Sequence, residues 1–143
     1  HLLTDEVRVD ELTWDVRQAV MELNPRYQVS VMLGTLPDDP DGLLLRGNRT
    51  LLFTALKNLT ENACKYGDNG HARLRTHFGP AEIGIEVENT GRAIPETDQP
   101  YLFEPFYRAR QTADEVRGYG VGLSLVARIV ALHGGRVSVQ SGD

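Results

Sequence analysis

Polar side chains suited to holding phosphate and a base recur at helical spacing near the middle of the chain. Asn58, Asn62, Lys65 and Tyr66 stand at i, i+4, i+7 and i+8 and therefore share one helical stripe. A carboxamide oxygen suits Mg²⁺, a lysine ammonium attracts phosphate, and a tyrosine ring can stack on a base. The stripe could therefore line a pocket, but a plain amphipathic helix with solvated polar groups explains it as well.

A glycine-rich segment offers a second means of holding phosphate. The sequence from Gly118 to Leu123 reads Gly-Tyr-Gly-Val-Gly-Leu and directly precedes an apolar pattern that predicts a helix over 123–132. Alternating glycines let the backbone approach a ligand closely, and the start of a helix presents unpaired N–H groups to phosphate oxygens. The spacing matches neither the Walker A pattern nor the dinucleotide fingerprint. A glycine hinge without a ligand is the alternative.

Two further segments carry polar or aromatic groups in predicted loops. Asn89 and Gly91 follow a predicted strand, where a polar side chain can hold a ligand edge, although a simple turn is the favoured explanation when they are taken alone. Segment 102–110 contains three aromatic residues. Arg108 and Arg110 in that segment and Arg117 beyond it could reach a terminal phosphate if the loop closed. Solvated arginines are the alternative, which stays open for Arg110.

Hydrophobic periodicity predicts the elements that would position these groups. Leu52, Ala55 and Leu56 begin a buried helix face over 51–66, with Asn48 as its N-cap. A second helix is predicted over 11–23, and strands are predicted over 6–10, 28–33, 43–45, 72–78, 83–87 and 136–140. Because helices and strands interleave but one strand pair is a hairpin, we expect an α/β (α+β) two-layer sandwich, with a mixed sheet and helices on one face.

The composition restricts the class of protein. At 143 residues the chain is long enough for one domain with a real core. Its formal net charge of −5 provides no basic surface for nucleic acid or an anionic membrane. Cys64 is the only cysteine, which excludes a disulfide framework and fits a reducing intracellular setting. Its position in the predicted helix over 51–66 indicates that it fills space as a small apolar side chain. The sequence has no apolar run of transmembrane length and no signal-peptide pattern.

The order of these segments resembles that of the ATP-binding catalytic domain of sensor histidine kinases, within the gyrase, Hsp90, histidine kinase and MutL superfamily. Residues 58–66 look like the N box of that family, 89–95 the G1 box, 103–108 the F box and 118–123 the G2 box. Each box alone is a weak signal, but four boxes in order span nearly the whole chain. The resemblance implies a Bergerat-type fold for Mg·ATP, with 1–143 as a single catalytic domain and 95–118 as its ATP lid.

The resemblance also implies roles for individual residues. Asn62 would ligate Mg²⁺ through its side-chain oxygen, and Asn58 would lie toward the phosphates and the metal. Lys65 would contact phosphate, Tyr66 would lie against the adenine, and Arg108 would approach the terminal phosphate from the lid. The implied catalytic residues are Asn58, Lys65 and Arg108. The other implied nucleotide-binding residues are Asn89, Gly91, Ile94, Arg117, Gly118, Gly120, Val121, Gly122 and Leu123.

The chain departs from the family pattern at identifiable positions. Asn89 stands where the family usually has an aspartate that accepts a hydrogen bond from the adenine amino group. A carboxamide oxygen can accept that bond without a charge, so weaker nucleotide binding or relaxed base choice is expected. Ala93 replaces the usual second glycine of the G1 box and would stiffen the lid hinge. We also expect a fragment in which 1–5 is a linker remnant and the family's final strand is missing, which leaves an open sheet edge.

The resulting prediction is a two-component histidine kinase domain that transfers the γ-phosphoryl group of ATP to a histidine on a separate dimerisation domain. Because His1, His71, His77 and His133 lie in no phosphoacceptor motif, the chain is not expected to phosphorylate itself. The expected partners are that dimerisation and phosphoacceptor domain and a downstream response regulator, but not nucleic acid. The expected location is cytoplasmic, at the cytosolic end of a membrane-bound sensor kinase, without direct membrane contact. The alternatives are a superfamily ATPase or serine kinase, and a catalytically degenerate interaction module.

Overall fold

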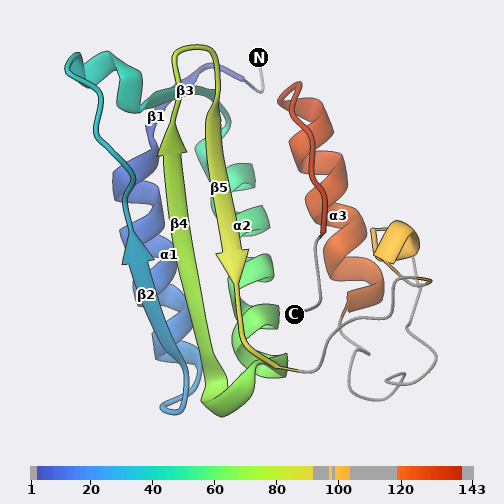
Figure 1. The fold of residues 1–143 in the computed structure, drawn as a ribbon. Coiled ribbons are helices and arrows are strands. Elements are labelled where there is room, and N and C mark those ends of the chain that lie inside the picture. The colour runs from blue at the N-terminus through green and yellow to red at the C-terminus, as the bar shows by residue number, and fades with distance from the viewer. Residues whose placement is uncertain (1–2, 92–96, 98, 104–118, 140–143) are drawn as a thin grey trace.

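The computed structural model describes residues 3–91, 97, 99–103 and 119–139. These residues form α-helices, β-strands and short 3₁₀ turns, which alternate along the chain (Figure 1). The helices are α1 (Val9–Leu23), α2 (Arg49–Tyr66) and α3 (Tyr119–Leu132). The strands are β1 (Asp5–Arg8), β2 (Gln28–Met32), β3 (Leu44–Gly47), β4 (His71–Phe78) and β5 (Ile83–Glu88), and the 3₁₀ turns are Pro40–Leu43, Asp68–Gly70 and Gln99–Tyr101.

The central sheet is mixed and has the strand order β2–β4–β5 (Figure 1). β2 runs parallel to β4, and β4 runs antiparallel to β5. Buried and exposed residues alternate along β4, which is why a period-two pattern specifies this strand and its register. The hairpin between β4 and β5 closes through the Gly79 N–H, which donates to the Glu82 carbonyl at 2.9 Å. The predicted mixed sheet and its hairpin are therefore confirmed. β1 and β3 pair antiparallel in a separate two-stranded sheet.

Helices α1 and α2 cover one face of the central sheet (Figure 1). Their apolar stripes meet the inward side chains of the strands, and burial of that apolar surface provides most of the drive to fold. α3 packs against α2, where Ala55, Val126 and Ile129 form a second buried cluster. This arrangement confirms the predicted two-layer α+β fold. The main core consists of Val7, Leu12, Val16, Val20, Val29, Leu56, Ala63, Cys64, Ala72 and Leu74.

Several element boundaries differ from the predictions. Asp5, expected in a linker remnant, is the first residue of β1, and α1 begins at Val9, which shortens the predicted strand over 6–10. α3 begins at Tyr119, four residues before the predicted start at 123. The predicted strand over 136–140 is wrong for residues 136–139, which belong to no strand. A β-strand needs a neighbouring strand with which to form hydrogen bonds. The side chain of Val137 instead packs against the apolar cluster between α2 and α3.

Candidate functional site

The polar stripe of α2 lies beside the core, as its spacing predicts. The helix begins after Asn48, whose Oδ1 accepts from the Leu51 N–H at 3.0 Å, so the predicted N-cap is confirmed. Asn58, Asn62 and Tyr66 are half-buried, whereas Lys65 is exposed. The Lys65 ammonium lies 5.3 Å from the centroid of the Tyr66 ring, within the range of a cation–π contact. The stripe thus presents two amides, a cation and a ring at the rim of the helix.

The segment after β5 is fastened to the C-terminal end of α2. Asn89 Nδ2 donates to the Ala63 carbonyl in the last turn of α2 at 2.8 Å. Gly91 bridges to Gly67, which directly follows α2. A Cβ on Gly67 would lie 2.6 Å from the Ala63 oxygen and 2.9 Å from Asn89 Cβ, so only glycine allows this approach. Asn89 and Gly91 are therefore held beside the Lys65–Tyr66 end of the stripe.

The glycine-rich segment forms the first turn of α3 instead of preceding it. Gly120, Val121 and Gly122 lie within the helix that begins at Tyr119. The first four N–H groups of an α-helix have no partner within the helix and can bind an anion. α3 runs antiparallel to α2, so its first turn lies at the same end of the molecule as the C-terminal end of α2 (Figure 1). Leu123, the next residue, is buried at 6% exposure.

Part of the predicted site lies outside the described residues. That part includes Ala93 and most of the predicted lid over 95–118, together with the predicted ligand residues Ile94, Arg108, Arg117 and Gly118. Within the predicted lid, Leu102 is described and is 2% exposed. The structure therefore joins Asn89 and Gly91 to the C-terminal end of α2 and places the first turn of α3 at the same end of the molecule (Figure 1). The lid contacts stay predictions.

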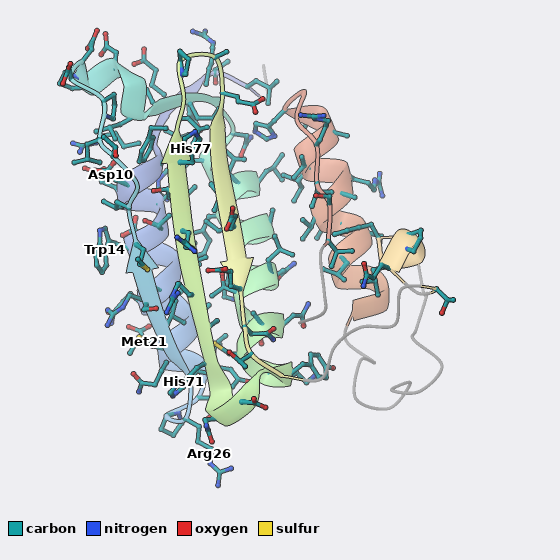
Figure 2. The ribbon with its side chains drawn as sticks, in the orientation of Figure 1. Asp10, Trp14, Met21, Arg26, His71 and His77 are labelled. Carbon is teal, nitrogen blue, oxygen red and sulfur yellow. The ribbon has the colours of Figure 1, made fainter. Side chains whose placement is uncertain are left out.

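An open hollow of about 670 Å³ lies elsewhere, between α1, β2, β4 and the end of β5. Its lining includes Trp14 and Arg17 of α1 and His71 and Arg73 of β4; Trp14 and His71 lie near the two ends of β2 in Figure 2. Asn58 and Asn62 do not line it, and it meets the predicted site only at the segment that follows β5. Arg17 Nε donates to the Val29 carbonyl on β2 at 2.8 Å. The hollow is thus a separate feature from the α2 stripe.

Cys64 behaves as a packing residue. Its side chain is 1% exposed and belongs to the main core. Burial raises the pKa of the Cys64 thiol to about 11, because a thiolate is poorly solvated there. The thiol is therefore protonated and unreactive near neutral pH, as expected for an apolar filler. Among the helices that the structure describes, none combines the length and apolar character needed to cross a bilayer.

Known proteins resemble this chain over most of its length. The family described as "Histidine kinase-, DNA gyrase B-, and HSP90-like ATPase" matches residues 47–143. Heme sensor protein HssS of Staphylococcus haemolyticus is 34% identical over 140 residues, which are 97% of this chain and 29% of HssS. Signal transduction histidine-protein kinase ArlS of the same species is 31% identical over 139 residues, which are 96% of this chain and 30% of ArlS.

The fold also matches that of solved structures. The catalytic domain of histidine kinase ThkA superposes with a TM-score of 0.77 at 22% identity, over 97% of this chain and 88% of that domain. Identity this low establishes the fold alone. The chain spans less than a third of the length of HssS and ArlS. Because the family match covers well over half of the sequence, the chain belongs to the histidine kinase-, DNA gyrase B- and HSP90-like ATPase family.

Proposed function

We propose that the chain is the ATP-binding catalytic domain of a two-component sensor histidine kinase. It binds Mg·ATP at the end of the molecule where the α2 stripe, the segment after β5 and the first turn of α3 come together. It then offers the γ-phosphoryl group to a histidine on a separate dimerisation domain. The observation that carries the proposal is that the segment after β5 is bound to the C-terminal end of α2 and that α3 begins at the same end of the fold (Figure 1). The similarity to ArlS, whose name describes a histidine-protein kinase, supports it.

The side chains on α2 fit the proposed ligand. Among the described residues, no group of three or more His, Cys, Asp or Glu side chains could hold a metal ion. Mg²⁺ retains several waters and is commonly held by few protein ligands together with substrate phosphates. The Asn62 amide oxygen, with Asn58 one turn away, is then sufficient on the protein side. Lys65 contacts phosphate and Tyr66 lies against the base.

Asn89 has a defined hydrogen-bonding role in this proposal. A backbone carbonyl only accepts, so the contact with Ala63 requires the amide nitrogen of Asn89 to face it. That orientation leaves Asn89 Oδ1 as an acceptor for the amino group of adenine. The departure from aspartate is thus compatible with base recognition, without a negative charge at the site.

Catalysis by this domain consists of positioning and charge neutralisation, as in phosphoryl transfer generally. Bound Mg²⁺ supplies charge neutralisation between the phosphates. The unpaired N–H groups at the start of α3 bind phosphate oxygens, and Gly120 and Gly122 allow the phosphates to approach the helix closely. From the lid, Arg108 and Arg117 approach the terminal phosphate. Asn58 is a neutral amide and cannot act as a general base, so steady ATP hydrolysis is not expected.

The phosphoacceptor lies on another domain. His71 and His77 are exposed residues of β4, and both ring nitrogens of His133 make hydrogen-bonding contacts with the backbone. None of these described histidines belongs to the proposed nucleotide site. The phosphoacceptor histidine therefore belongs to a dimerisation domain, and a response regulator is the second partner. The proposed location is the cytosolic end of a membrane-bound kinase.

Thermal unfolding with and without Mg·ATP tests the proposal. Ligand at 100 times Kd stabilises the folded state by about 2.7 kcal/mol, which for a domain of this size raises Tm by roughly 10 °C. Asn62→Ala should abolish that rise. Lys57→Ala, on the opposite flank of α2, should retain it as the matched control. An unchanged Tm in the wild-type protein at millimolar Mg·ATP would contradict the proposal.

A further inference from the structure

His133 links the C-terminal end of α3 to the N-terminal end of α2. Its Nε2 lies 3.0 Å from the backbone nitrogen of Asn48, which donates to it, and its Nδ1 lies 2.8 Å from the Ile129 carbonyl oxygen. A carbonyl only accepts, so Nδ1 must carry the hydrogen, and Nε2 must present its lone pair to the Asn48 N–H. These contacts define one neutral tautomer of the imidazole, protonated at Nδ1.

The surroundings of the ring are adapted to this contact. A Cβ on Gly47 would lie 2.5 Å from Cδ2 and 2.7 Å from Nε2 of His133, so glycine is required for the imidazole to reach the backbone. The neighbouring Asn48 uses its side chain to cap α2 and its N–H to bind His133. Asn48 therefore caps α2 and also connects the start of α2 to His133 at the end of α3.

Apolar side chains also pack between the two helices. Ala55, Val126 and Ile129 form the buried cluster between α2 and α3. Apolar contacts are non-directional, so a hydrogen bond at one end of α3 adds a directional constraint on its tilt. Val126 precedes His133 by seven residues and follows Tyr119 by seven. At a rise of 1.5 Å per residue, the first turn of α3 lies roughly 10 Å along the helix from Val126. A tilt of α3 by about 10° around Val126 would therefore displace the first turn by about 2 Å.

We propose that His133 is a positioning residue that sets where the first turn of α3 lies relative to the polar stripe of α2. The Nδ1-protonated imidazole fixes the C-terminal end of α3, and this contact limits the tilt of the helix. The consequence for nucleotide affinity rests on the proposed function, because the first turn of α3 is the proposed phosphate-binding element. The link itself and its tautomer do not depend on that function.

The tautomer is tested by long-range ¹H–¹⁵N correlation of the imidazole rings. His133 is assigned as the signal that disappears in His133→Asn. We expect the chemical shifts of a neutral ring protonated at Nδ1. A ring protonated at Nε2, or one exchanging freely between tautomers, would overturn the proposal because neither can maintain both contacts.

The positioning role is tested by ATP affinity in a matched series. His133→Gln can still place an acceptor near the Asn48 N–H and should bind Mg·ATP within about twofold of wild type. His133→Leu should bind more weakly than that, by no more than about fivefold, the factor that corresponds to one net hydrogen bond. His133→Asn, which is too short to reach Asn48, should resemble the leucine variant and replaces it if that variant fails to fold. Leu132→Ala, at an exposed neighbouring position, should behave as wild type. Unchanged affinity in both the leucine and asparagine variants would refute positioning.

Backbone amide shifts separate this inference from the proposed function. If the wild-type chain binds no ATP, the proposed function fails, but the geometry of α3 remains measurable. His133→Asn should then change the amide chemical shifts of Tyr119, Gly120 and Gly122 at the N-terminal end of α3. Shifts confined to the residues around His133 would show only a local contact and would contradict the proposal.

Discussion

The contact between Asn89 and Ala63 makes a sharp prediction for Asn89→Asp. Asn89 Nδ2 donates to the Ala63 carbonyl at 2.8 Å. An aspartate carboxylate has no hydrogen to donate and would instead face a carbonyl oxygen. It would also place a negative charge at the C-terminal end of α2, where the helix dipole is already negative. The substitution that restores the usual family residue should therefore destabilise this chain.

The size of the effect follows from these two terms. Loss of one net hydrogen bond costs about 1 kcal/mol, and an unfavourable charge at a helix end costs about 0.3–1 kcal/mol. Because Asn89 is exposed, solvent limits the second term. We expect a loss of about 1–2 kcal/mol at pH 7, which corresponds to a decrease in Tm of roughly 4–8 °C.

Urea denaturation without nucleotide provides the assay, and pH provides its signature. A protonated aspartic acid can donate to the Ala63 carbonyl, and loss of that bond on ionisation raises the pKa of the new carboxyl group in the folded state. The loss of stability at pH 7 should therefore shrink as the pH falls towards about 4, the ordinary aspartate pKa, and level off below it. Asn89→Ala should lose only the hydrogen-bond term. Thr90→Asp adds the same charge at the next, exposed position and should retain most of the stability. Equal stability of Asn89→Asp and wild type at pH 7, or equal losses in Asn89→Asp and Thr90→Asp, would show that the hydrogen bond to Ala63 does not stabilise the fold.

Other substitutions test the core, the thiol and a surface charge pair. Leu74→Ala removes a fully buried side chain and should cost about 2–5 kcal/mol in urea unfolding, whereas Leu36→Ala, at 54% exposure, should cost little. Because burial raises the pKa of Cys64 to about 11, iodoacetamide at pH 8 should label it only after unfolding, and rapid labelling of the folded protein would contradict its burial. Partial burial opposes ionisation of Asp10, but the hydrogen bond and charge of Arg8 lower its pKa overall. The stability that Asp10 contributes is therefore present above the unfolded pKa and lost as the pH falls through the folded pKa, so the difference between wild type and Asp10→Asn should shrink on acidification.

Local sequence patterns were sufficient for most of the fold. Asn48 before an apolar stripe predicts the start of α2, because a carboxamide cap satisfies an N–H that the helix leaves unpaired. Period-two alternation predicts β4, because one face of that strand is buried. The mixed sheet, its hairpin and the two-layer arrangement follow from these elements and are confirmed.

The errors arise where tertiary contacts override local preference. Glycines disfavour helix, which is why Gly120 and Gly122 masked the true start of α3 at Tyr119. Residues 136–139 alternate like a strand, but Val137 packs against helices and no ladder partner joins it among the described residues.

The links at Asn89 and His133 join residues far apart in sequence. Asn89 lies 26 residues from Ala63, and His133 lies 85 residues from Asn48. Local periodicity carries no signal for such contacts. Gly67 and Gly47 leave room for these two contacts and are the only local indications of them in the sequence.

Titration of the ¹⁵N-labelled chain with Mg·ATP, followed by backbone amide shifts, tests the nucleotide site most directly. We expect saturable shifts at Asn58 and Asn62 on α2, at Gly91 after β5, and at Gly120 and Gly122 in the first turn of α3. Shifts confined to the hollow around Trp14 and Arg73, or no shifts at millimolar Mg·ATP, would contradict it.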